Sequence, residues 1–253
     1  IMNACLCSVF FIDESQRVTL SDIGSVAEIR KWAKELNSEV SELELLSQFR
    51  CNGSNGYLAW LDDVLEIRET ANYDLKDIDY DIRILDTPNE VRDLIFEKNK
   101  IDNRSRMLAG YCWEWIKAGK NDSTVHDIKI DDFEMSWNLG NSSTFAIDEN
   151  SINEIGCIHT SQGLEFDYAG VIIGDDMRYE DGHIVTDFNK RARTDQSLKG
   201  IKKLYKQDPD KALKEADQII KNTYRTLMTR GMKGCYVYCT NKELANYLRE
   251  CIK

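Results

Sequence analysis

Short apolar runs, rich in β-branched and aromatic residues, alternate along this chain with segments whose apolar residues recur at helical spacing. The predicted strands lie at residues 7–12, 43–50, 80–85, 105–113, 155–159, 168–173 and 235–239. The predicted helices lie at about 22–36, 57–67, from 87 onward, 209–228 and 242–252. This alternation predicts an α/β fold in which helices cover both faces of a parallel sheet. Sheets of this kind bind ligands at the carboxyl ends of their strands.

Helix caps and polar stretches refine this prediction. Residues 87–90 read Thr-Pro-Asn-Glu, which places a capping residue before a proline and a glutamate three residues after the cap. This pattern is typical of a helix start. Asp22 or Ser25 can cap the helix that runs through residue 36. The polar and aromatic residues 119–140 predict a hairpin excursion from the sheet.

Charge is distributed unevenly. The chain carries a formal net charge of −11 over 253 residues, which does not fit a simple polyanion-binding protein. Residues 189–225, however, contain 11 Lys and Arg against 5 Asp and Glu. This basic segment therefore carries +6, and the remainder of the chain carries −17. A basic segment on an acidic body can mark a polyanion contact, or it can be a solvated helical insertion.

Several classes of protein do not fit the sequence. No apolar run approaches the roughly 20 residues that a membrane helix needs, and no signal peptide is recognisable. The eight cysteines form no Cys-x-x-Cys motif. Cys235 and Cys239 fall on one face of a predicted strand with no histidine nearby, so they predict no zinc site. We expect buried free thiols in a reducing cytoplasm, no membrane partner and no metal ligands.

Polar clusters occur at four places where an α/β sheet would expose side chains. Residues 13–17 read Asp-Glu-Ser-Gln-Arg, and residues 46–50 read Leu-Ser-Gln-Phe-Arg. Residues 156–167 read Gly-Cys-Ile-His-Thr-Ser-Gln-Gly-Leu-Glu-Phe-Asp, and residues 222–231 read Asn-Thr-Tyr-Arg-Thr-Leu-Met-Thr-Arg-Gly. Backbone N–H groups at a turn that opens a helix can hold an anion, and the planar guanidinium of arginine suits phosphate.

Each cluster also has a purely structural interpretation. Acidic residues often end a buried strand at the surface, and a single arginine is more often a surface or salt-bridged residue. Arg230, next to Gly231, fits a cation that complements the dipole at a helix C-terminus. One cluster alone therefore indicates little, whereas four in this order are informative.

Together the clusters resemble the motifs of superfamily 1 helicases of the UvrD/Rep kind. Gly-Leu-Glu-Phe-Asp at 163–167 resembles motif V, Leu-Met-Thr-Arg-Gly at 227–231 resembles motif VI, and residues 46–50 resemble motif IV. Gln16 precedes Arg50 by 34 residues, which is similar to the separation of motifs III and IV. The sequences of residues 10–18 and 222–234 are most similar to those of the bacterial helicase-like P-loop ATPases that are grouped with the Schlafen proteins.

This resemblance implies a RecA-like lobe of an ATP-driven motor that acts on single-stranded DNA or RNA. It implies that Gln16 senses the γ-phosphate of ATP and that Arg50 and Arg230 act as arginine fingers. Gly163 and Glu165 would lie on the ribose side of the nucleotide. The residues expected toward the phosphates of the strand are His159, Thr160 and Ser161, with Lys190, Arg191 and Arg193 of the basic segment as additional contacts.

The chain departs from the family pattern at one important point. It contains no Gly-x-x-x-x-Gly-Lys-Ser/Thr sequence, the loop that binds the phosphates of ATP and places Mg²⁺. The resemblance therefore implies that residues 1–40 are the tail of a first RecA-like lobe and that residues 41–253 are the second lobe. We expect ATP and Mg²⁺ to bind in a longer parent protein that supplies the N-terminal ATPase lobe. The chain alone is expected to be inactive and to hold no cofactor tightly.

Two other functions are compatible with the sequence. The chain can be a nucleic-acid-binding module whose motor motifs are relics. It can also be a protein-interaction or regulatory domain, in which the acidic body meets a basic partner.

Overall fold

One mostly parallel sheet forms the centre of the protein. The computed structural model describes residues 2–22, 25–43, 51–71, 75–76, 78–116, 122, 124–138 and 144–252. In spatial order the strands are β1 (Asp81–Ile84), β9 (Gly231–Cys239), β6 (Phe166–Ile173), β2 (Ser105–Ala109), β5 (Glu154–Gly156), β4 (Phe133–Trp137) and β3 (Ile128–Ile130). All neighbouring pairs are parallel except β3 and β4.

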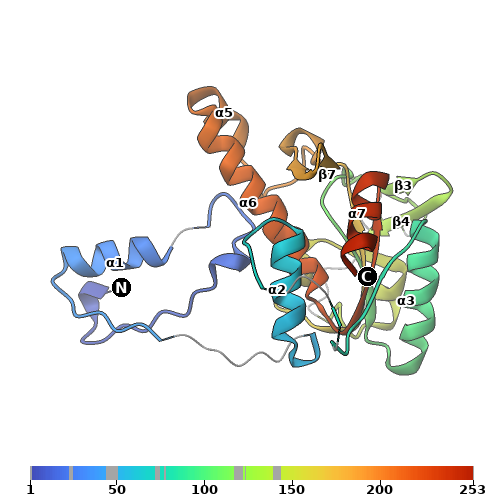
Figure 1. The fold of residues 1–253 in the computed structure, drawn as a ribbon, viewed down its shortest axis with the longest axis horizontal. Helices are drawn as coiled ribbons and strands as arrows, with labels where there is room; N and C mark the ends of the chain where they lie inside the picture. Colours follow the sequence, from blue (N-terminus) through green and yellow to red (C-terminus); the bar gives the residue numbers. More distant parts are fainter. Residues whose placement is uncertain are drawn as a thin grey trace.

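Helices cover both faces of this sheet, as Figure 1 shows. On one face, α3 (Pro88–Asp102) contacts β2, β6 and β9. The other face is covered by α2 (Asn55–Val64), α6 (Pro209–Met228) and α7 (Lys242–Ile252). The predicted α/β fold with a RecA-like arrangement is therefore confirmed.

The central strands divide their side chains between these two layers. In β6, Val171 and Ile173 belong to the core under α6, whereas Ile172 belongs to the core under α3. Successive side chains of a strand point to opposite faces, so a continuous apolar run serves two cores at once. This is why the strands read as unbroken apolar segments and not as alternating ones.

Local capping signals place the helices as predicted. Thr87 and Glu90 form a reciprocal capping box at the start of α3, and Ser25 and Glu28 form another at α1 (Val26–Glu35). Asp208 caps α6 by accepting a hydrogen bond from the backbone N–H of Lys211. The basic segment contains the short helix α5 (Ile201–Gln207) and most of α6, so the predicted helical insertion is confirmed.

Two hairpins extend from the sheet. β3 and β4 form the excursion predicted within residues 119–140, and β4 then pairs with β5 in the main sheet. A second, two-stranded sheet is formed by β7 (Met177–Glu180) and β8 (His183–Thr186). Asp181 and Gly182 connect these strands with φ angles of 50° and 86°, which Gly182 adopts without steric cost.

The predicted buried strand at residues 7–12 is wrong. These residues form no strand, and Val9 and Phe11 are 74% and 85% exposed. A strand needs a neighbour to pair with its backbone groups, and no described residue pairs with this segment. The segment and α1 lie to one side of the sheet and join the body through η2 (Glu14–Gln16) (Figure 1).

Three further boundaries differ from the predictions or fall beyond the described residues. β2 ends at Ala109 rather than at 113, and residues 158–161 form the short helix α4 (Ile158–Ser161) instead of extending a strand. Most of the strand predicted at 43–50, including Arg50, lies outside the described residues. Within the part of the chain that is described, no helix is long and apolar enough to cross a membrane.

Asp81 on the edge strand β1 predicts a pH-dependent contribution to stability. Its carboxylate accepts hydrogen bonds from Arg83 Nε (2.8 Å) and Tyr236 Oη (2.7 Å). Burial raises the pKa of Asp81, but these hydrogen bonds outweigh burial and hold the pKa below its usual value. The carboxylate therefore stabilises the fold above about pH 4, and this contribution is lost as the pH falls through the folded-state pKa.

We expect Asp81→Asn to lower the free energy of unfolding at pH 7 by less than about 1 kcal/mol, because solvent screens a partly exposed pair. The difference from the unmodified chain should shrink as the pH falls below about 4. Urea unfolding at pH 7, 5 and 3 measures it, with the more exposed Asp93→Asn as the control. An Asp81→Asn difference that is the same at every pH would contradict the linkage.

Candidate functional site

Residues 13–20 lie along α6 and bring the first predicted cluster to the last one. Asn222 Nδ2 donates to the carbonyl oxygens of Arg17 (2.9 Å) and Glu14 (3.3 Å). Arg17 Nη1 forms an ion pair with Glu215 Oε2 at 2.7 Å. Val18 is only 1% exposed and belongs to the core under α6. The segment is therefore docked by its backbone, by a charge pair and by one buried apolar side chain.

Gln16 lies where this segment meets the third cluster. Its carbonyl oxygen accepts a hydrogen bond from Gln162 Nε2 at 3.3 Å, and its own Nε2 donates to Asp13 Oδ2 at 2.6 Å. Burial raises the pKa of Asp13, but the hydrogen bonds from Ser15 and Gln16 lower it by more, so the pKa lies below its usual value. Asp13 thus remains a carboxylate at neutral pH and fixes the Gln16 carboxamide.

Arg225 ties this junction to α2. Its Nη1 donates to Ser15 Oγ at 3.1 Å, and its Nε pairs with Oδ1 of Asp62, a residue of α2 whose side chain is 3% exposed. Arg68 Nε approaches the other oxygen of Asp62 at 2.8 Å. A buried carboxylate needs partners of this kind because desolvation disfavours the charge. The ion pair holds η2, α2 and α6 together.

The third cluster forms a short helix and a tight loop. Gly156 and Cys157 lead from β5 into α4, on which His159 is exposed and Thr160 is half-buried. Ser161 is fully buried, and its Oγ donates to the Cys157 carbonyl oxygen at 3.0 Å. The Ser161 hydroxyl therefore serves the helix itself. Of the three strand contacts predicted in this cluster, His159 and Thr160 reach the surface.

The loop that follows α4 is open to solvent at two predicted nucleotide contacts. Gly163 and Glu165 are exposed, and Gly163 has a φ of 88°. A Cβ at Gly163 would have no atom within 4 Å, so the backbone here faces open space. Glycine is favoured because an L-residue adopts this conformation only with strain.

Arg230 lies directly behind this loop, at the junction of α6 and β9. Its side chain is buried; Nε donates to the Thr226 carbonyl oxygen at 3.0 Å, and Nη1 donates to the Leu164 carbonyl oxygen at 3.2 Å. The structure thus brings Arg230 together with the Gly163 loop. Packing requires glycine at position 231, because a Cβ there would collide with the Gly234 carbonyl oxygen.

The predicted finger Arg50 lies outside the described residues. Its neighbour Cys51 is buried, and Cys51 Sγ lies 3.8 Å from the carbonyl oxygen of Thr229. The residue after Arg50 therefore contacts the residue before Arg230.

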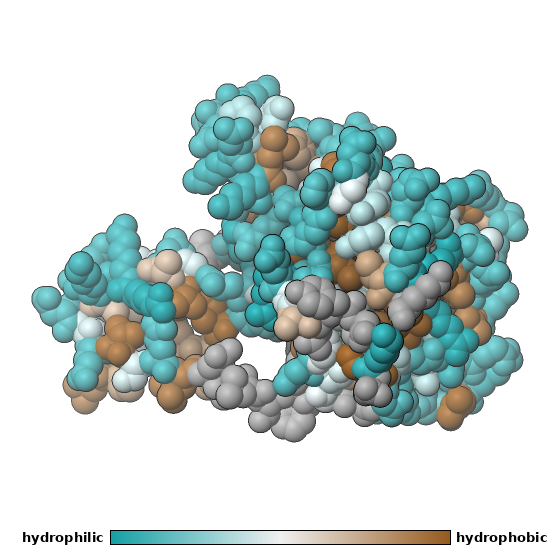
Figure 2. All heavy atoms as spheres, in the orientation of Figure 1, coloured by the Kyte–Doolittle hydropathy of each residue, from teal (hydrophilic) through white to brown (hydrophobic). Residues whose placement is uncertain are grey.

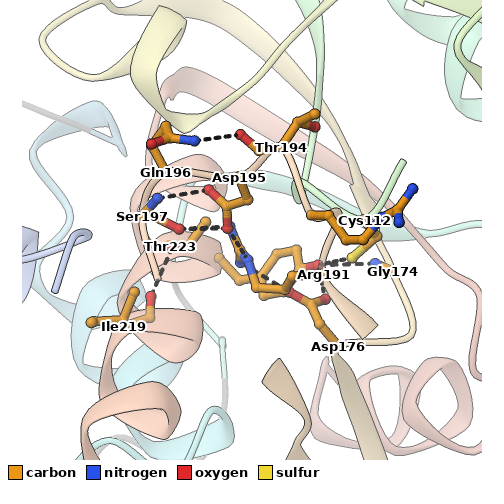
Figure 3. A network of polar contacts seen from close by, with 12 residues as sticks. Cys112, Gly174, Asp176, Arg191, Thr194, Asp195, Gln196, Ser197, Ile219 and Thr223 are labelled. Atoms are coloured by element: carbon orange, nitrogen blue, oxygen red, sulfur yellow. Dashed lines mark hydrogen bonds and ion pairs between the residues drawn. The ribbon is translucent and has the colours of Figure 1, made fainter. Parts of the chain in front are cut away.

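The three predicted contacts from the basic segment have different environments. Lys190 is exposed, and the Arg193 side chain is 88% exposed with its Nε 3.4 Å from Glu114 Oε1. The Arg191 side chain, in contrast, is 2% exposed between Asp176 (3.0 Å) and Asp195 (2.6 Å). Figure 3 shows this guanidinium enclosed by the two carboxylates. Its environment is that of a structural ion pair and not of a surface cation.

The Arg191 pair belongs to a buried polar network at the carboxyl end of β6. Tyr224 of α6 donates to Asp176 Oδ1 and accepts from the backbone N–H of Gly174 at 3.0 Å. Ser197 Oγ donates to Asp195 Oδ2 at 2.6 Å, and the Ser197 carbonyl accepts from the Leu20 N–H at 2.6 Å. Although burial disfavours the charged guanidinium, Asp176 and Asp195 raise the pKa of Arg191 above its usual value. The network therefore links α6 and the basic segment to residues 13–20.

Sequence reasoning missed the residues that assemble the junction. Asn222, Arg225 and Gln162 connect the clusters, yet none was predicted as a site residue. All three stand inside the motif-like phrases at 156–167 and 222–231. Their positions within those phrases were the available signal. Across the described residues, no group of three or more His, Cys, Asp or Glu is arranged to hold a metal ion.

The sheet, its two helical layers and the junction on α6 define a RecA-like α/β protein in which motif-like segments distant in sequence meet. The chain belongs to the Schlafen group 3, DNA/RNA helicase domain family, whose model matches residues 1–241. This match confirms the helicase-like family. Assignment to the second lobe of a UvrD/Rep-type motor stays a prediction.

One curated relative allows the length of this chain to be compared with that of a similar protein. The uncharacterised protein YPL245W of Saccharomyces cerevisiae is 25% identical over 270 residues, which cover 98% of this chain and 58% of that protein. The chain thus spans less than two thirds of that relative. No solved structure matches.

Asn222 gives a direct test of the junction. We expect Asn222→Leu to release residues 13–20 from α6, because two backbone carbonyls lose their donor, each worth about 1 kcal/mol. Hydrogen exchange at the Leu20 amide, which donates to Ser197, should accelerate by about tenfold or more. Exchange in β6 should not change.

Asn89→Leu is the matched control, because Asn89 is on α3 and its side chain donates a hydrogen bond to Asp132 at 3.0 Å, away from the junction. Unchanged exchange at Leu20 in Asn222→Leu would show that the other contacts dock the segment without it.

Proposed function

We propose that this chain supplies the second RecA-like lobe of an ATP-dependent helicase or translocase that acts on single-stranded DNA or RNA. In this proposal residues 1–40 are the tail of the first lobe, and residues 41–253 are the second lobe. The phosphate loop belongs to the first lobe of a longer protein.

One observation carries this proposal. Three segments that resemble motifs III, V and VI meet at one place: Gln162 donates to Gln16, and Asn222 and Arg225 donate to the segment that contains Gln16. In a nucleic-acid motor these segments must communicate, because a change at the nucleotide has to move the strand contacts. A chain that kept only the fold would not need this direct hydrogen-bonded junction.

The loop next to the junction has two features that a nucleotide-binding site requires, an open backbone and a nearby cation. The open backbone at Gly163 would accommodate the nucleotide, and Arg230 behind the loop would stabilise charge on the phosphates. Because Arg230 donates to Leu164 in this structure, its use as an arginine finger requires the loop to shift when the lobes close. Bound Mg²⁺ and ATP would supply the phosphoryl transfer whose energy drives the motor.

ATP turnover measured with and without single-stranded DNA and RNA tests the proposal. We expect none from this chain alone and strand-stimulated turnover from a protein extended upstream through a phosphate-loop lobe. Turnover by the purified chain that disappears in Arg230→Ala would overturn the division into lobes. If neither protein hydrolyses ATP although both are well folded, the proposed motor function is overturned.

A non-catalytic strand-binding module is the second candidate. The 1% exposure of Arg230 favours it, because a buried guanidinium on main-chain carbonyls also fits a structural role. The same assay separates the candidates, since a module would bind the strand without stimulated turnover.

A further inference from the structure

The basic segment and the three residues before it form a groove outside the junction. The groove has a volume of about 330 Å³ and lies between η6 (Phe188–Lys190), α5 and α6. This volume falls within the range of small-ligand sites. In Figure 1, α5 and the adjoining end of α6 protrude from the body of the molecule.

Aromatic and apolar side chains form one part of the groove. The rings of Phe188 and Tyr205 are in contact, with centroids 5.6 Å apart and an interplanar angle of 59°. Phe188 is buried, whereas Tyr205 is 42% exposed, as is the neighbouring Leu213 at 48%. Figure 2 shows apolar atoms between hydrophilic ones in this region. The groove thus presents one supported aromatic ring to solvent.

Two lysines form another part of the groove. Lys202 and Lys206 line the groove, are exposed and stand one helical turn apart on α5. Neither forms an ion pair with any carboxylate among the described residues. Asp187 also lines the groove, but its carboxylate caps η6 by accepting from the Asn189 N–H at 2.9 Å. The balance of charge in the groove is therefore positive.

We propose that this groove binds one nucleotide of a single strand, with the base on Tyr205 and the adjacent phosphates on Lys202 and Lys206. An exposed aromatic ring flanked by cations is the arrangement with which proteins bind single strands without sequence preference. The proposal rests on the proposed function, because it assumes that the strand is the substrate, and it extends the strand path from α4 to α5.

Fluorescence anisotropy of labelled oligo(dT) and oligo(rU) with the 253-residue chain, at several salt concentrations, tests the groove. Tyr205→Ala is expected to raise Kd about tenfold, and Tyr205→Phe to leave Kd nearly unchanged, because only the ring is needed. Lys202→Gln and Lys206→Gln should each reduce the slope of log K against log salt by about 0.7.

Lys203→Gln is the matched control, since Lys203 is exposed on the same helix and does not line the groove. Circular dichroism verifies that each variant is folded. If the unmodified chain binds the strand but the groove variants behave like Lys203→Gln, the proposed nucleotide binding in the groove is overturned and the proposed function stands. If the unmodified chain binds neither oligonucleotide, strand binding by this chain and the groove are both overturned.

Discussion

Replacing Arg230, the proposed arginine finger, by alanine, in a protein that joins this chain to a phosphate-loop lobe, is expected to lower kcat for ATP hydrolysis by roughly 10³–10⁵-fold. An arginine finger contributes this much because its charge is needed where negative charge accumulates in the transition state. KM should change far less, since the γ-phosphate is neutralised mainly as it transfers. Steady-state ATP hydrolysis with saturating single strand measures both quantities.

Two further variants distinguish catalysis from folding. Arg230→Lys keeps the charge but not the planar fork, so we expect it to fold and still to lose most of the turnover. Arg30→Ala removes an arginine on α1 whose side chain is 59% exposed, and its turnover should remain within about twofold. A folded Arg230→Ala variant with near-normal turnover would remove Arg230 from the proposed active site.

The second large effect concerns the fold. Arg191→Met is expected to lower the free energy of unfolding by about 3–5 kcal/mol, because it leaves two buried carboxylates without their cation. Asp176 is fully buried, and the side chain of Asp195 is 2% exposed. Urea denaturation at pH 7 measures the loss.

Arg193→Ala, at a side chain that is 88% exposed, is the control for stability, with an expected change within about 0.5 kcal/mol. A loss below about 1 kcal/mol in Arg191→Met would contradict the buried-pair interpretation. Replacing both Asp176 and Asp195 by asparagine in the Arg191→Met background should restore part of the stability, since the uncompensated charges are then gone.

The Arg191 network also bears on how the proposed motor would work. It connects Tyr224 on α6 to Ser197, and Ser197 in turn holds Leu20. Residues 13–20 and the basic segment therefore share one buried anchor. A movement of α6 on nucleotide binding would be transmitted to both, because a closely packed interior shifts as connected units.

The sequence alone determined the features that depend on local patterns. The cap at Thr87 marked one helix start, Asp22 or Ser25 marked another, at which the structure has Ser25, and apolar runs of strand length marked β6 and β9. The order of four motif-like phrases predicted the helicase-like family, which the match over residues 1–241 confirms. These features follow from periods of about 2 and 3.6 residues and from contacts within a few positions, so they can be read directly along the chain.

Tertiary structure decided the features that depend on partners far apart in sequence. The run at 7–12 has the composition of a strand but no neighbour to pair with, and Arg191 has the charge of a surface contact but two buried carboxylates around it. Arg225 meets Asp62 across 163 positions. Local patterns specify which conformation a segment favours, whereas burial and charge pairing depend on which segments the completed sheet brings together.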